Sequence, residues 1–163
     1  MDLLIRSALP GDVEALHALR VAAADWLQSR GIQQWRRDDV PLDAIEEQVA
    51  LGEWNVAVRD GAISGALRLL ASDRVWPEDD VPAAYIHGFM IDRLHGGTGL
   101  GTTLLGWAAD RAREAGARAL RLDCMETNVR LRQYYISQGF TPVGRFVHRS
   151  PWHPVLLLER TLD

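Results

Sequence analysis

The sequence contains no lysine, only one cysteine and no apolar run of the length that a membrane-spanning helix needs. All 18 basic residues are arginines, and 22 acidic residues give a formal net charge of -4. This balance argues against nucleic acid or an anionic membrane as a partner, because both attract basic surfaces. The lone Cys124 excludes an intramolecular disulfide and a cysteine-based zinc site. No stretch reads as a signal peptide, so we expect a cytoplasmic protein.

The length of 163 residues predicts a single domain, 1–163, large enough to bury roughly 70% of its unfolded surface. Apolar residues make up 47% of the chain and charged residues 25%, as in an ordinary globular protein. The histidines have no metal-ligand spacing, so no metal is expected.

Hydrophobic periodicity divides the chain into short strands and longer amphipathic helices. Strands are predicted at 3–8, 54–59, 62–70, 85–91, 118–124, 140–147 and 155–161, and helices at 12–30, 41–51, 99–116 and 128–138. Asp12 is expected to cap the first helix and Gly31 to end it. This alternation implies an α/β architecture, a mixed α+β sheet with helices on both faces.

The most informative stretch is a predicted buried strand, 85–91, followed by a glycine-rich turn and a helix. Unpaired N–H groups at a helix start bind anions, and glycine lets a ligand approach the backbone closely. A nucleotide-hydrolysing loop is excluded because Thr102 stands where lysine is required. A dinucleotide fingerprint is excluded because its third glycine would fall at Gly101, one place early.

The run Gly96-Gly97-Thr98-Gly99-Leu100-Gly101 resembles the pyrophosphate loop of the GCN5-related N-acetyltransferases (GNAT), (Arg/Gln)-x-x-Gly-x-(Gly/Ala), which binds acetyl-coenzyme A. It departs from the family pattern at Gly96, where arginine or glutamine is usual. A second segment, 128–140, is similar to the family's Asn…Tyr-x-x-x-Gly-Phe motif. The resemblance covers essentially the whole chain. It implies the GNAT fold, a central mixed sheet splayed at its fourth and fifth strands.

The resemblance also implies site residues. Acetyl-CoA is expected to bind the backbone of the central strand, the glycine loop and one helix start, namely Phe89, Met90, Ile91, Gly96, Gly97, Thr98, Gly99, Leu100, Gly101, Thr102 and Asn128. Tyr135 matches the family tyrosine that protonates the departing thiolate. A phenol suits that role, because its ordinary pKa near 10 keeps it protonated at neutral pH.

The general base is less closely specified by the motifs. His87 lies on the central strand, where serotonin N-acetyltransferase carries a histidine that helps remove the amine proton, and imidazole titrates in the useful range. It could equally be a hydrogen-bonded core residue. Glu126 is the second candidate. Cys124 leaves an acetyl-cysteine route open, whereas His17, His148 and His153 are interpreted as structural or surface residues.

The function expected from the resemblance is an acetyl-CoA-dependent N-acetyltransferase. It would acetylate a primary amine of an unidentified small molecule or peptide by direct transfer in a ternary complex. The alternative is a non-catalytic acyl-CoA-binding sensor or scaffold. The acceptor site of this fold would draw on Trp26, Trp35, Trp76, Trp152, Glu78, Asp79 and Asp80. Exposed apolar surface and the family resemblance suggest a homodimer.

Overall fold

The computed structural model describes residues 2–147 and 153–163, so His148 and Trp152 lie outside the described residues. Contacts divide the chain into two compact units. The first holds the residues up to Leu69 together with Gly88–Leu104, and the second holds Leu70–His87 with the described residues from Leu105 onward. No helix in the described ranges combines the length and the apolar character needed to cross a bilayer.

The described strands form one mixed sheet in the order β1-β2-β3-β4-β5-β7-β6. They are β1 (Leu3–Ser7), β2 (Trp54–Arg59), β3 (Ala62–Leu70), β4 (Ala83–Ile91), β5 (Ala119–Met125), β6 (Thr141–Phe146) and β7 (Val155–Thr161). The α-helices are α1 (Val13–Ser29), α2 (Leu42–Ala50), α3 (Leu100–Glu114) and α4 (Val129–Ser137), and the 3₁₀ turns are η1 (Pro10–Asp12) and η2 (Arg93–His95). The predicted mixed sheet is confirmed.

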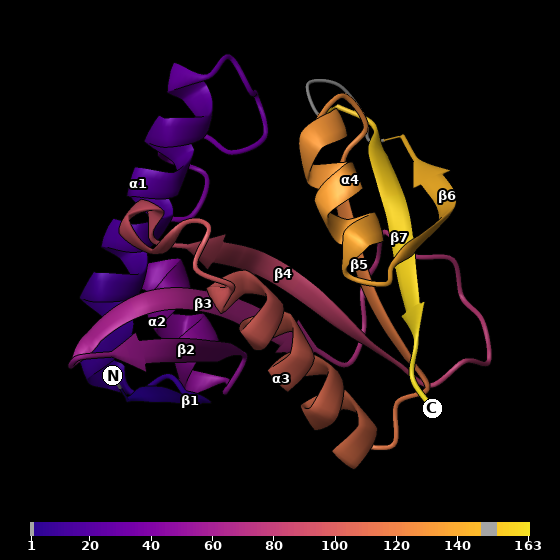
Figure 1. The fold of residues 1–163 in the computed structure, drawn as a ribbon, viewed down its shortest axis with the longest axis horizontal. Coiled ribbons are helices and arrows are strands. Elements are labelled where there is room, and N and C mark those ends of the chain that lie inside the picture. The colour runs from indigo at the N-terminus through magenta and orange to yellow at the C-terminus, as the bar shows by residue number, and fades with distance from the viewer. Residues whose placement is uncertain (1, 148–152) are drawn as a thin grey trace. The chain divides into compact units, whose positions relative to one another are not determined.

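In the first unit, β1, β2 and β3 are antiparallel neighbours, with α1 and α2 beside them (Figure 1). One face of this sheet packs on the two helices through a cluster that includes Leu16, Ile45, Val56 and Ala66. Successive strand residues point to opposite faces, so Gly65 faces away from these helices. A Cβ on Gly65 would lie 3.6 Å from Leu104 of α3, so this unit carries helices on both faces, as predicted.

The predicted N-cap position of α1 is confirmed at Asp12, although its side chain does not cap the helix. Asp12 stands at the N-cap position, but its side chain makes no capping hydrogen bond because η1 has already turned its backbone to φ -88° and ψ -11°. Its carboxylate accepts from Arg6 Nη1 at 2.6 Å and from the Leu9 amide at 2.7 Å. The hydrogen bond from Arg6 lowers the pKa of Asp12 below its ordinary value. Asp12 therefore ties the end of β1 to the turn before the helix.

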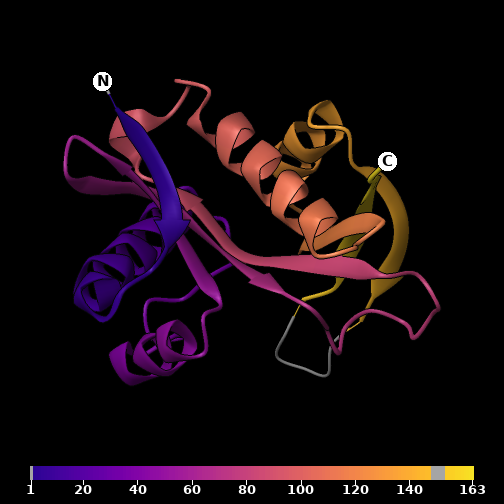
Figure 2. The same cartoon turned by 90° about the horizontal axis from the view of Figure 1, so that it is seen from below.

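In the second unit, β7 pairs antiparallel with both β5 and β6. Both views show β6 and β7 side by side, with α4 close to them (Figures 1 and 2). The buried Arg121 of β5 holds the preceding loop to the sheet, because it donates to Asp79 at 2.6 Å, to Glu159 at 2.7 Å and to the Tyr85 hydroxyl at 3.0 Å. Trp76 and Tyr85 pack edge to face beside it, with their ring centroids 6.0 Å apart.

Strand β4 changes character along its length. Its parallel register with β5 covers Ala83, Ala84 and Tyr85 only, which is consistent with the expected splay. Gly88 then has a φ of +59°, a left-handed conformation that L side chains rarely adopt in a strand. A glycine of this kind within a strand marks a local irregularity that redirects the backbone.

Candidate active site

The segment after β4 forms a tight turn and then a helix start. Asp92 begins η2 by accepting a hydrogen bond from the Leu94 amide at 3.0 Å. Gly97 and Gly99 have φ values of +73° and +82°, so both need the conformational freedom of glycine. A Cβ at either position would meet no protein atom within 4 Å, so the backbone there is open to a close approach.

The backbone amides of this loop differ in whether they already donate a hydrogen bond within the protein. Thr98 donates to the His95 carbonyl at 3.4 Å, which makes its amide a poor candidate for ligand binding. The first backbone bond at the start of α3 joins the Thr103 amide to the Gly99 carbonyl at 3.1 Å. The amides of Leu100, Gly101 and Thr102 precede that bond and have the orientation of helix-start donors. This geometry suits a phosphate or pyrophosphate group.

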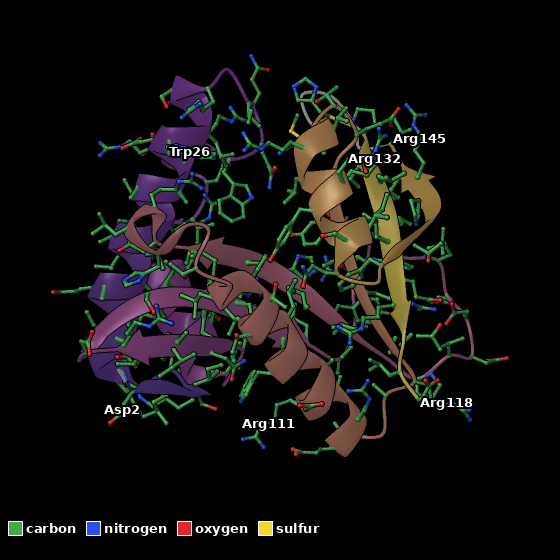
Figure 3. The ribbon with its side chains drawn as sticks, in the orientation of Figure 1. Asp2, Trp26, Arg111, Arg118, Arg132 and Arg145 are labelled. Carbon is green, nitrogen blue, oxygen red and sulfur yellow. The ribbon has the colours of Figure 1, made fainter. Side chains whose placement is uncertain are left out.

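Arg93 lies beside Gly96, the position where the family pattern has arginine or glutamine. Its guanidinium could supply the positive charge that an arginine at that position would bring. A Cβ on Gly96 would lie 3.9 Å from the guanidinium of Arg93. That guanidinium lies 3.8 Å from the ring centroid of Trp26, so the indole of α1 holds it beside the loop. Figure 3 labels Trp26 on α1. Sequence reasoning missed Arg93, because stacking on a residue 67 positions earlier leaves no local signal.

The end of β4 combines buried and accessible side chains. Met90 is buried in the cluster of the first unit, whereas Phe89 and Ile91 are partly exposed. The roles expected for these three residues belong to their backbone, so core packing of Met90 is compatible with them. The absence of a side chain at Gly65 lets β3 approach closely, since a Cβ there would lie 3.2 Å from the Met90 carbonyl oxygen.

Tyr135 is a buried residue of α4, with 5% of its surface exposed. Its ring packs edge-on against Phe140 at a centroid distance of 5.8 Å. Burial raises the pKa of Tyr135 well above its ordinary value, and the neighbouring Cys124, Asp123 and Tyr134 add to the effect. The phenol therefore stays protonated at any pH at which the enzyme would work, as a general acid requires.

His87 lies in a cluster that the sequence did not reveal. Its Nε2 is 2.6 Å from Asp73 Oδ2, and the ligand atoms of Asp73, His87 and Asp123 all lie within 4.8 Å of one another. Such a trio could hold a metal ion. Here a direct hydrogen bond already joins two of its members, which favours a carboxylate–imidazole pair. No motif pointed to Asp73, because the loop and β4 meet only in the folded chain.

The two remaining candidate residues, Glu126 and Asn128, have structural partners. Glu126 accepts a hydrogen bond from Arg145 Nε at 2.5 Å, so its carboxylate is engaged in an ion pair. Figure 3 labels Arg145 on β6. Asn128 caps α4, its Oδ1 accepting from the Leu131 amide at 3.2 Å. This cap uses the oxygen of the side-chain amide and not its nitrogen.

Two of the aromatic residues expected to line the acceptor site are packed inside their own units. Trp76 is buried against Val155 and Leu157. Trp35 is partly buried, and its ring centroid lies 3.8 Å from the guanidinium carbon of Arg20. Asp79 is bound to Arg121, whereas Glu78 and Asp80 are exposed.

The family follows from a direct comparison. A model of the Acetyltransferase (GNAT) family matches residues 20–140, which is well over half of the chain. The chain therefore belongs to the GNAT acetyltransferase family and is an acetyl-CoA-dependent N-acetyltransferase.

Individual relatives agree with this assignment. The chain is 27% identical over 141 residues to the uncharacterized N-acetyltransferase YesJ of Bacillus subtilis, covering 82% of this chain and 78% of YesJ. It is 28% identical over 155 residues to an aminoglycoside N(6')-acetyltransferase type 1 of Stenotrophomonas maltophilia, covering 92% and 94% of the two chains.

Solved structures show the same fold. A GNAT-family acetyltransferase from Listeria monocytogenes superimposes with a TM-score of 0.80 at 28% identity, covering 98% of this chain and 95% of that one. The structure of yncA from Salmonella typhimurium, solved with its cofactor acetyl-CoA, has a TM-score of 0.72 at 21% identity over 100% of this chain and 95% of its own. The GNAT fold predicted from the motifs is confirmed.

Proposed function

We propose that this enzyme transfers the acetyl group of acetyl-CoA directly to a primary amine of a small molecule or peptide, in a ternary complex. The observation that carries the proposal is that the candidate acid, Tyr135, and the candidate base, His87, both have Asp123 as a neighbour. Asp123 lies within 4.8 Å of the His87 cluster atoms and also raises the pKa of Tyr135. An acid and a base that share a neighbouring carboxylate supply the two proton transfers that amide formation needs.

The residues of the glycine loop and β4 fit acetyl-CoA. The amides of Gly97, Gly99, Leu100, Gly101 and Thr102 would hold the pyrophosphate, with Arg93 adding positive charge. The backbone of Phe89, Met90 and Ile91 would hold the pantetheine arm, and Asn128 would also contribute to acetyl-CoA binding. Gly96 and Thr98 would shape the turn, since the Thr98 hydroxyl and amide both bond the His95 carbonyl.

In the reaction that we propose, His87 accepts a proton from the ammonium form of the acceptor, and the neutral nitrogen then attacks the thioester carbonyl carbon. The C–S bond then breaks, and Tyr135 donates its phenolic proton to the departing sulfur. The second proton of the nitrogen restores the phenol through solvent. Glu126 remains the alternative base if His87 has only a structural role.

The state of Cys124 supports direct transfer over an acetyl-cysteine intermediate. Cys124 is buried, and burial raises the pKa of its thiol to about 11. Because the thiolate is the nucleophilic form of cysteine, little of the reactive form exists at neutral pH.

The direct test is release of free thiol from acetyl-CoA in the presence of a panel of amines, with the product mass measured in parallel. The panel should include an aminoglycoside with a 6'-amine, because one relative carries that name. A product heavier by one acetyl group supports the proposal. Tight acetyl-CoA binding without thiol release on any amine would favour the sensor alternative.

We further propose a homodimer that works in the cytoplasm, where a single free cysteine is common. The end strand β6 favours association, because edge strands offer unpaired backbone groups and Val143 on β6 is 52% exposed. Sedimentation that gives a monomer mass at every concentration would reject the dimer.

A further inference from the structure

The pairing of Asp73 with His87 goes beyond the roles that the family motifs assign. The two residues are 14 positions apart, one in the loop before β4 and the other on β4. The Asp73 side chain is 7% exposed and that of His87 is 30% exposed. The carboxylate is therefore almost enclosed, whereas part of the imidazole remains accessible.

This hydrogen bond determines which ring nitrogen can take a proton. An ionised carboxylate only accepts hydrogen bonds, and a neutral imidazole carries a single N–H. With Asp73 Oδ2 at 2.6 Å from Nε2, the proton of neutral His87 belongs on Nε2, and the lone pair is left on Nδ1. The same contact holds the plane of the ring.

We propose that Asp73 is the positioning residue that holds His87 as the general base, with Nδ1 as the proton-accepting atom. This inference rests on the proposed function. Asp73 itself does not contact the substrate, because its carboxylate is enclosed and bound to Nε2.

Asp123 adds a second carboxylate to the cluster and thereby indicates the class of acceptor. Its carboxylate oxygen lies within 4.8 Å of both other ligand atoms, so a positive charge that develops on His87 meets two negative charges. The same charges attract a protonated alkylamine more than a neutral aromatic amine. The acceptor class that fits is a basic primary alkylamine, which arrives as an ammonium ion at neutral pH.

The proton balance is then complete without a further reagent. The ammonium nitrogen passes one proton to Nδ1 of His87 and attacks the thioester carbon as a neutral amine. Tyr135 protonates the sulfur as the C–S bond breaks, and a second proton from the nitrogen restores the phenol. The products are the amide and free coenzyme A, and His87 returns its proton to solvent.

The test is a cycle of three variants, Asp73→Asn, His87→Gln and the double variant, measured with an alkylamine accepted by the wild type. Asp73→Asn keeps the size of the side chain but removes its charge and allows the wrong tautomer. We expect kcat/KM to fall about 10²-fold, within the range for a mispositioned base. Acetyl-CoA affinity should stay within about twofold. Asp110→Asn, the same change on the exposed surface of α3, is the matched control and should keep wild-type activity.

The double variant distinguishes positioning from a structural role. If Asp73 acts only through His87, adding Asp73→Asn to His87→Gln costs no further activity. Two losses that multiply would overturn the proposal, as would wild-type turnover in Asp73→Asn. Activity should also survive dialysis against EDTA, and its loss there would show that the cluster works by holding a metal. Wild-type protein without transferase activity would instead count against the proposed function.

Discussion

Replacement of Gly88 by alanine should destabilise the first unit by an amount that the structure defines. The alanine Cβ would lie 2.7 Å from Cη2 of Trp54 and 3.3 Å and 3.4 Å from two further atoms of the same ring. Trp54 cannot move aside easily, because it is 2% exposed and its Nε1 donates to Gln48 Oε1 at 2.9 Å.

Two costs add in this variant. Left-handed backbone at φ +59° costs an L residue roughly 1–2 kcal/mol. Forcing a methyl group into a packed core costs roughly 1–3 kcal/mol. We therefore expect the free energy of unfolding to fall by about 2–5 kcal/mol, which corresponds to roughly 2–4 °C in Tm for each kcal/mol in a chain of this size.

Gly52→Ala is the matched control for the backbone cost alone. Gly52 has a similar φ of +75°, but its Cβ would meet no atom within 4 Å. Chemical denaturation of both variants should show that Gly88→Ala costs at least about 1 kcal/mol more. A Trp54→Phe background removes the clashing atoms, so the cost of Gly88→Ala should fall there to that of Gly52→Ala. Equal costs for the two glycines in the wild-type background would refute this reasoning.

Three further predictions concern the site. Tyr135→Phe should lower turnover by roughly 10²–10⁴-fold with little change in acetyl-CoA affinity. Because burial raises the pKa of Tyr135, the wild-type pH–rate profile should show no loss of this acid as pH rises to about 10. A basic limb below about pH 10 that disappears in the variant would contradict the raised pKa, and near-normal turnover of the variant would refute Tyr135 as the acid. Arg93→Ala should weaken coenzyme A binding in calorimetry by more at low salt than at high salt, and a salt-independent loss would argue against a charge contact. Cys124 should react with iodoacetamide at pH 8 about 100-fold more slowly than an ordinary thiol, since a pKa of about 11 instead of 9.0 reduces the thiolate fraction by that factor, and rapid labelling of folded protein would reopen the acetyl-cysteine route.

The sequence predicted the parts of this enzyme that depend on local pattern. Alternating and helical periodicities placed every α-helix and strand of the described chain within a few residues of its observed bounds. The glycine motif located the helix start, and the second motif placed Tyr135 on α4. These features depend on residues close in sequence, so one sequence contains enough information for them.

The missed features depend on pairings across long sequence separations. Asp73 reaches His87 only because the loop before β4 folds back along that strand, and Asp123 joins them from β5. Glu126 could be proposed as a base from its position, but its partner Arg145 lies 19 residues further on. A glycine within a predicted strand does suggest an irregularity, so Gly88 could have been singled out. Its contact with Trp54 could not.

Two buried arginines show that partners distant in sequence decide whether a buried charge is stabilised. Burial alone would lower the pKa of Arg121, yet hydrogen bonds to Asp79, Glu159 and Tyr85 outweigh it and raise the pKa. Burial lowers the pKa of Arg20 to about 10, and its Nη1 has no hydrogen-bond partner among the described residues. A shift of the Arg20 pKa from 12.5 to about 10 corresponds to a destabilisation of the charged form by about 3 kcal/mol. A desolvated cation–π contact with Trp35 offsets this by about 2 kcal/mol. Both arginines occur in apolar stretches of sequence, so composition cannot tell the stabilising one from the costly one. What separates them is that the fold brings two carboxylates into direct hydrogen bonds with Arg121, whereas Asp39 acts on Arg20 only through a Coulombic interaction.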